Sequence, residues 1–289
     1  LTDPDQVLPR LEQRVAATHY AGDAFPWVDP LSLGLAAIQA AYLGAPYRVD
    51  PITLTGWTEP VIEDWSTRPR FIVDPENRWW QATRRLLEAG ARWFAGRSAI
   101  AIPDLQGGGE ILALLRGSER LAVDLVDCPE EIPPALQEIN AAWLDSPAVT
   151  VECDFSVMIS PQMFRRYFLP AVAQQTEWIG RTVFHLDGPG AIPHLDALLE
   201  LPVLTGIQWI PTPDRPHMVQ WIPLLRKIQA GGKNVVVACE PGEVLPLLEA
   251  LDPARLMLST VCAAPGKADA LMDQVNRRFG LCPDSVHQT

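Results

Sequence analysis

The stretch Thr182-Val183-Phe184-His185-Leu186-Asp187, followed by Gly188-Pro189-Gly190, carries the pattern that decides the fold. Its apolar and β-branched residues predict a strand over 182–187, with polar side chains at the carboxyl end. The glycines and proline that follow mark a tight turn, and a helix is predicted over 190–200. A short strand that ends in polar residues and leads into a helix is the repeating unit of parallel α/β proteins.

The same unit recurs along most of the chain. Further strands are predicted over 98–104, 149–155, 205–210, 234–239 and 255–261, and further helices over 107–116, 129–144, 161–179, 217–230, 242–250 and 266–279. The glycine-rich fingerprint of dinucleotide-binding folds is absent, because Gln106-Gly107-Gly108-Gly109 lacks the required spacing. The alternation therefore predicts an α/β fold of the closed (β/α)8 TIM-barrel type rather than a doubly wound sheet.

The first 95 residues are less regular than the rest. Helices are predicted over 1–20, 31–43 and 79–95, a hairpin over 47–65, and a short strand or an irregular loop over 24–30. The total length of 289 residues suits one α/β barrel, which commonly needs about 250 residues. We therefore predict a single barrel domain over 1–289 with an N-terminal helical and hairpin excursion.

Charge and cysteine usage exclude several classes of partner. The chain has 23 Lys and Arg against 35 Asp and Glu, a net charge of −12. An acidic surface repels nucleic acid and anionic lipid, and it disfavours a polyanionic substrate. No apolar run reaches the roughly 18 residues of a membrane span. The five scattered cysteines form no disulfide framework, so a cytoplasmic protein without nucleic-acid or membrane partners is expected.

Candidate site residues follow from the strand ends, where α/β barrels carry their chemistry. His185 and Asp187 lie two apart on one strand, so both side chains point to the same face. Such a pair binds a metal, shares a proton, or merely orders the following loop by a hydrogen bond. The remaining candidates for catalysis or for lining the substrate pocket are Asp104, Asp154, Cys153, Gln208, Trp209, Trp79 and Trp80.

Several of these candidates also have plain structural interpretations. Asp104 is either a general base or the cap of the following helix, and Asp154 is either a site carboxylate or a loop cap. Cys262, just after the strand over 255–261, is either a third metal ligand or a small buried residue. The Trp79-Trp80 pair either covers a pocket or belongs to a packed helix start.

A longer segment resembles a known family. Ile159-Ser160-Pro161-Gln162-Met163-Phe164-Arg165-Arg166-Tyr167-Phe168-Leu169-Pro170 resembles a signature of the uroporphyrinogen decarboxylase superfamily. Three further segments also resemble motifs of that superfamily. They are Asp104-Leu105-Gln106-Gly107 with Leu112-Ala113-Leu114-Leu115-Arg116-Gly117, His185-Leu186-Asp187-Gly188, and Ser259-Thr260-Val261-Cys262. The resemblance covers about residues 95 to 280 and implies a (β/α)8 barrel.

The superfamily has two functional branches. True uroporphyrinogen decarboxylases hold a substrate with many carboxylates through an arginine-rich N-terminal motif, and nothing like that motif is present here. The other branch, the cobalamin-linked methyltransferases, holds zinc with a His-x-Cys…Cys set. Resemblance to this branch implies a zinc site of His185, Asp187 and Cys262, in which Asp187 replaces the middle Cys. It also implies a small-molecule substrate and a corrinoid protein as partner.

Two alternatives remain open at this stage. The change from Cys to Asp allows a site without metal, in which His185 and Asp187 bind the substrate directly and the protein is a decarboxylase or another lyase. The second alternative is a relative that binds a small molecule and has lost the chemistry, because a fold alone does not define a function.

Overall fold

The computed structural model describes residues 2–31, 38–50, 52, 55–101, 106–145 and 151–280. Its helices are α1 (Pro4–Ala17), α2 (Ile38–Tyr42), α3 (Arg78–Trp93), α4 (Gly108–Arg116), α5 (Ser118–Asp127), α6 (Ile132–Leu144), α7 (Pro161–Met163), α8 (Leu169–Ile179), α9 (Leu195–Leu199), α10 (Ile222–Ala230), α11 (Val244–Ala250) and α12 (Pro265–Phe279). Its strands are β1 (Trp27–Val28), β2 (Tyr47–Asp50), β3 (Thr55–Thr58), β4 (Ala99–Ile100), β5 (Val151–Glu152), β6 (Thr182–Asp187), β7 (Leu204–Ile210), β8 (Asn234–Ala238) and β9 (Leu256–Ser259).

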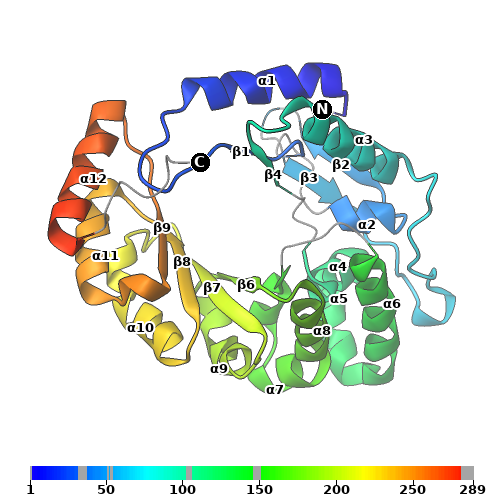
Figure 1. Cartoon of the computed structure of the whole chain (residues 1–289). Coiled ribbons are helices and arrows are strands. Elements are labelled where there is room, and N and C mark those ends of the chain that lie inside the picture. Colours follow the sequence, from blue (N-terminus) through cyan, green and yellow to red (C-terminus); the bar gives the residue numbers. More distant parts are fainter. Residues whose placement is uncertain are drawn as a thin grey trace.

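The strands form parallel sheets with helices outside them. β5 to β9 make one sheet in chain order, and every neighbouring pair in it is parallel. β1 and β4 form a second, two-stranded parallel sheet, whereas β2 and β3 form the predicted antiparallel hairpin. Figure 1 shows the strands of both parallel sheets toward the middle of the molecule and the helices around them. The predicted parallel α/β architecture is confirmed for these residues.

Several elements depart from the predicted bounds. α5 was not predicted, although Leu121 and Leu125 supply its buried face. The strands predicted over 98–104 and 149–155 are represented by the two-residue β4 and β5, with 102–105 and 146–150 outside the described residues. The helix predicted over 161–179 contains a π-helical turn at Phe164–Phe168. The turn lies just before Pro170, which cannot donate the regular helical hydrogen bond.

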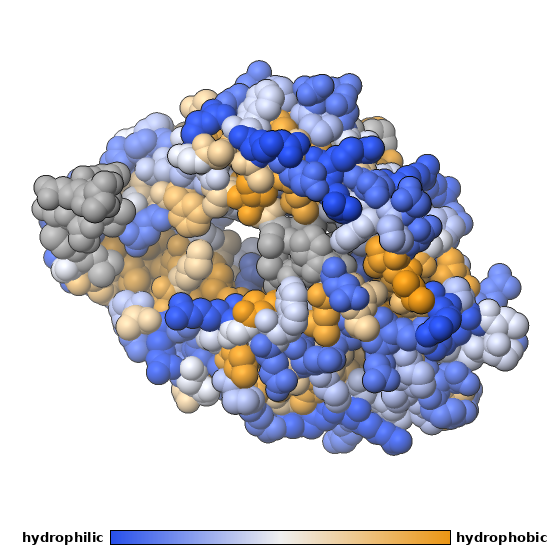
Figure 2. Space-filling view, turned by 45° about the vertical axis from the view of Figure 1, so that its right-hand side comes forward, coloured by the Kyte–Doolittle hydropathy of each residue, from blue (hydrophilic) through white to orange (hydrophobic). Residues whose placement is uncertain are grey.

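Side-chain alternation along β6 separates the core from the inner face of the sheet. Phe184 and Leu186 are buried, and both belong to the main hydrophobic core. Val183, His185 and Asp187 point to the opposite face and keep part of their surface exposed. Figure 2 shows a hollow near the middle of the view, with hydrophobic residues along its rim. The inner face of β6 is therefore less buried than its core face.

Strand register sets which residues meet on that inner face. Glu152 pairs with His185, His185 with Gln208, Gln208 with Val236, and Val236 with Met257. These five residues form one row across β5 to β9, which we call the central row. Its first three members are polar and its last two are apolar. No helix in the described part of the chain has the length and apolar character needed to cross a membrane.

Candidate active site

The polar half of the central row gathers a set of potential ligands. One ligand atom each from Glu152, Asp154 and His185 lies within 4.8 Å of the other two. Glu152 ends β5, and Asp154 begins the short 3-10 helix η3 (Asp154–Met158) directly after it. Glu152 is buried, whereas Asp154 and His185 are half-buried. Two carboxylates and an imidazole therefore converge at the carboxyl ends of neighbouring parallel strands.

The imidazole of His185 is oriented by its neighbour on β7. His185 Nδ1 lies 2.9 Å from Gln208 Oε1. Since a carboxamide oxygen only accepts hydrogen bonds, Nδ1 carries the proton and donates it. In the tautomer with this proton on Nδ1, the lone pair is on Nε2, the nitrogen available to a metal or a proton. The Gln208 side chain thus selects the tautomer that ligation or base chemistry requires.

A third carboxyl group supports the segment that carries Asp154. Glu110, in the first turn of α4, accepts a hydrogen bond of 2.8 Å from the backbone N–H of Phe155. Burial raises the pKa of Glu110, the charge of Asp154 adds to this effect, and the Phe155 hydrogen bond opposes it. Glu110 therefore belongs to the electrostatic surroundings of the Glu152, Asp154 and His185 set.

The glycines before Glu110 let α4 approach β5 closely. A Cβ on Gly107 would lie 2.2 Å from the Glu152 carbonyl oxygen, and one on Gly109 would lie 2.7 Å from Cys153 Sγ. Neither position has room for a side chain without movement of the β5 backbone or the α4 helix. The Gly107-Gly108-Gly109 run, which does not fit a dinucleotide fingerprint, therefore serves close packing beside the site.

His194 supports the same segment from the other side. It lies at the end of the 3-10 helix η5 (Pro189–His194), which begins shortly after β6. Its ring is 2% exposed, and Nε2 lies 2.8 Å from the Ser156 carbonyl oxygen, to which it donates. Burial lowers the pKa of His194, and the Ser156 hydrogen bond only partly opposes this. The ring is therefore neutral in the folded protein at pH 7.

A pH dependence of stability follows from this neutral ring. The unfolded chain binds the proton of His194 near the ordinary pKa of about 6.5, whereas the folded chain binds it at lower pH. The contribution of His194 is therefore fully present above about pH 6.5 and is lost as the pH falls below it. We expect the urea midpoint to fall more between pH 7.5 and 5.5 in the wild type than in His194→Gln. Equal slopes for the two proteins would contradict this.

The residues of the predicted metal set do not all meet. Asp187 ends β6 on the same face as His185, as predicted, but Glu152 and Asp154 are the groups that meet His185. Cys262 follows β9 as a half-buried free thiol and is not a member of that set. Among the described residues, the converging ligands are thus two oxygens and one nitrogen, without sulfur.

The other predicted site residues lie in different surroundings. Gln208 contacts His185, whereas Trp209 points to the opposite face, is fully buried and packs on Trp221 at 4.8 Å between ring centroids. Cys153 is buried, and burial raises its pKa far above the ordinary value, so it is a neutral thiol in the core. Asp104 lies outside the described residues.

The Trp79-Trp80 pair packs against the N-terminal elements. The Trp79 ring meets Tyr47 of β2 at 5.0 Å, and the Trp80 ring meets Tyr42 of α2 at 5.3 Å, both edge to face. These contacts anchor α3 to α2 and the hairpin. The structure therefore brings together His185, Asp154 and Gln208, and it places Trp79, Trp80, Trp209 and Cys153 in packing contacts.

Two residues of the site were missed by sequence reasoning. Glu152 was inside a predicted strand, and its period-2 relation to Asp154 could have identified it, because both side chains share one face. Glu110 carried a weaker signal, an acidic residue directly after a glycine run at a helix start. Its role depends on a contact with a segment 45 residues away, which no local pattern reveals.

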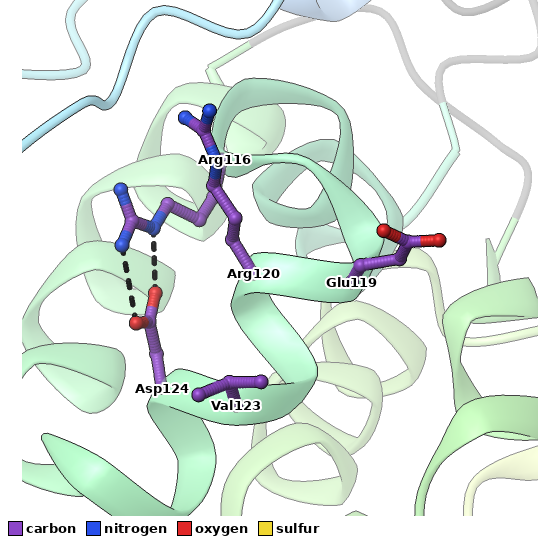
Figure 3. A pocket seen from close by; sticks show the side chains of 5 residues that line it. All are labelled: Arg116, Glu119, Arg120, Val123 and Asp124. Atoms are coloured by element: carbon purple, nitrogen blue, oxygen red, sulfur yellow. Dashed lines mark hydrogen bonds and ion pairs between the residues drawn. The ribbon is translucent and has the colours of Figure 1, made fainter.

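A shallow depression on α4 and α5 has a structural explanation. Arg116, Glu119, Arg120, Val123 and Asp124 line it. Figure 3 shows Arg116 and Asp124 joined by two contacts, which measure 2.6 Å and 3.1 Å. Arg116 also donates to the carbonyl oxygens of Ile62 and Glu63. This ion pair ties the segment after the hairpin to α4 and α5, so we assign it to stability.

Comparison with known proteins identifies a solved structure with a similar fold. No protein-family model matches the chain, and no curated protein matches it. The structure is similar to that of a methyltransferase from Methanosarcina mazei, with a TM-score of 0.62. The superposition covers 96% of this chain and 86% of the other, at 10% sequence identity. At that identity the likeness shows a shared fold alone.

Proposed function

We propose that this chain is an enzyme that transfers a methyl group to or from a small molecule, with a metal ion held by Glu152, Asp154 and His185. The observation that carries the proposal is the convergence of these three ligands within 4.8 Å at the carboxyl ends of parallel strands. The fold likeness to a methyltransferase and the motifs that resemble cobalamin-linked methyltransferases support the reaction class. Zinc is the metal that the resemblance favours, and a corrinoid protein is the partner.

The residues present fit a divalent metal ion. Carboxylate oxygens and imidazole nitrogen are established ligands of zinc and of other first-row metals. Metal-bound histidines almost always donate their second ring N–H to an acceptor, as His185 donates to Gln208. A bound zinc ion supplies Lewis acidity, which lowers the pKa of a coordinated thiol or water. Without sulfur, the converging set consists of harder ligands, in the sense of hard and soft Lewis bases, than a site with two thiolates.

The chain's own residues supply orientation and a binding surface. Gln208 holds the His185 ring in the tautomer that is protonated on Nδ1, which leaves the Nε2 lone pair for a ligand. Val236 and Met257 continue the central row as apolar side chains, and Met257 is 62% exposed. The polar half of the row therefore suits the reacting group of a substrate, and the apolar half suits its non-polar part.

We also propose that the two parallel sheets are arcs of one (β/α)8 barrel. β5 to β9 follow one another in chain order, as the strands of such a barrel do. β1 and β4 are parallel as well, and Figure 1 shows them in the upper part of the view, above the five-stranded sheet. In this arrangement the central row faces the barrel axis, and its polar half lies toward the carboxyl ends of the strands, where barrel enzymes act.

Metal content and methyl transfer test the proposed function together. The purified protein is analysed for zinc, cobalt, manganese and iron, and methylcobalamin is then offered with a small thiol as acceptor. We expect about one metal ion per chain and loss of the methylcobalamin absorbance. A protein that binds no divalent metal and leaves methylcobalamin unchanged contradicts the proposal, and it favours the metal-free lyase or the non-catalytic binder.

The Gln208→Leu variant tests the assigned tautomer. Leucine is close to glutamine in size but accepts no hydrogen bond, so the His185 ring loses its orientation. Loss of such a partner typically weakens metal binding by about 10–100-fold. We therefore expect a Kd for Co²⁺ raised by about that factor, measured by absorbance titration. The exposed Gln220→Leu variant, in the 3-10 helix η6 (Met218–Trp221), is the matched control, and an equal Kd for both variants would refute the assignment.

A further inference from the structure

The Asp154 carboxylate is positioned by a segment outside the sheet. β5 ends at Glu152, so the ladder hydrogen bonds that fix Glu152 beside His185 stop two residues before Asp154. Asp154 begins η3, a short 3-10 helix of five residues. A ligand group must be held within about 0.5 Å to act with its neighbours. Something other than the sheet must therefore fix η3.

Glu110 holds the start of η3. Its carboxylate accepts the backbone N–H of Phe155 at 2.8 Å, and the backbone N–H of Asp154 also donates to it. Glu110 is itself fixed, because the adjoining Gly107 and Gly109 leave no gap between α4 and β5.

His194 holds the middle of η3 by a second backbone contact. Its Nε2–H donates to the Ser156 carbonyl oxygen at 2.8 Å, and its ring packs on Phe164 at 4.8 Å between centroids. η5 and η3 are also in tight contact, since a Cβ on Gly190 would lie 3.1 Å from Val157 Cβ. η5 directly follows the strand that carries His185, so this contact links the positions of His185 and Asp154.

We infer that Glu110 and His194 are positioning residues, which clamp η3 by its backbone and thereby set the Asp154 carboxylate against His185. The inference rests on the proposed function in one respect, that the positioned carboxylate is a metal ligand. Neither residue is a member of the converging ligand set itself. Their effect on the site passes through the backbone of Asp154, Phe155 and Ser156.

Two variants of Glu110 separate positioning from folding. Glu110→Ala removes both acceptor contacts, whereas Glu110→Gln keeps one carboxamide oxygen that accepts an N–H. We expect faster hydrogen exchange of the backbone amides of Asp154 and Phe155 in Glu110→Ala, and a Co²⁺ affinity reduced about ten-fold or more. Glu110→Gln should restore most of both. The control is Glu119→Ala, which removes an exposed acid from the first turn of α5.

His194 provides the second half of the test. His194→Ala should speed exchange of the peptide over 154–158 and weaken Co²⁺ binding. His194→Gln, whose amide can donate to the Ser156 carbonyl oxygen from the position of Nε2, should recover part of the loss. The shape of the Co²⁺ visible spectrum reports whether the ligand geometry has changed. A loss of stability alone does not alter this shape.

Each outcome decides one question. Exchange rates at 154–158 that stay at the wild-type value in both Ala variants overturn the inference. Faster exchange with an unchanged Co²⁺ affinity and spectrum also overturns it, because η3 would then move without consequence for the site. A wild-type protein that binds no Co²⁺ instead overturns the proposed metal site, and the exchange rates alone then decide whether Glu110 and His194 hold η3.

Discussion

His185→Ala is expected to abolish Co²⁺ binding in the accessible concentration range and to stop methyl transfer. His185 stands between Glu152 and Gln208 in the central row, so it is the only nitrogen ligand of the described set and the neighbour of both side chains. Its removal leaves two carboxylates without the third ligand. The loss of affinity should exceed the roughly 10–100-fold that follows from removing a partner outside the ligand set.

The control for this variant is His217→Ala. His217 is exposed and its side chain caps no helix, so the substitution removes an imidazole without touching the central row. Isothermal titration with Co²⁺ and the methylcobalamin assay give the two readouts. If His185→Ala retained wild-type affinity and turnover, the central row would not be the functional site.

Asp124→Ala is expected to cause the largest loss of stability among these variants. The Asp124 carboxylate accepts from Arg116 Nε at 2.6 Å, from Arg116 Nη2 at 3.1 Å and from Trp65 Nε1 at 3.0 Å. Burial alone would raise the pKa of Asp124, but the hydrogen bonds from Arg116 and Trp65 outweigh it and hold the pKa below its ordinary value. The carboxylate is therefore charged, and both of its oxygens accept hydrogen bonds.

Removing this carboxylate leaves a guanidinium that is 12% exposed without its counter-ion. Breaking one partner of a buried pair costs about 3–5 kcal/mol, because the remaining charge stays buried. We expect the free energy of unfolding, from urea titrations followed by tryptophan fluorescence, to fall by about that amount. Asp127→Ala, at the exposed end of the same helix, should change it by less than about 0.5 kcal/mol. A small effect at Asp124 would show that Arg116 is well solvated.

The sequence predicted the strands better than it predicted which side chains meet. The bounds 182–187 agree with β6, because this strand combines β-branched residues with a clear turn signal after Asp187. β5 is only two residues long, and α5 has a buried face of few residues, so both gave weak local patterns. The alternation of strands and helices was sufficient for the fold class, since it depends on no single element.

The composition of the ligand set could not be read from one strand. Residues two apart on a strand are separated by about 6.6 Å along it, whereas neighbouring strands lie about 4.8 Å apart. The nearest inner-face neighbours of His185 are therefore Glu152 and Gln208, across the sheet, rather than Asp187. The same period-2 rule places Trp209 opposite Gln208 and could have removed it from the predicted pocket.

A ligand that binds the central row is expected to stabilise the folded protein. Glu152, His185 and Gln208 come from three separate strands, so a ligand held by this row cross-links segments that are distant in the chain. Any compound that binds only this folded arrangement raises the free energy of unfolding, by about 2.7 kcal/mol at a concentration of 100 times its Kd. The melting temperature rises as a consequence. A thermal-shift screen of metals and small molecules against the wild type and His185→Ala would thus sort ligands of the row from all others.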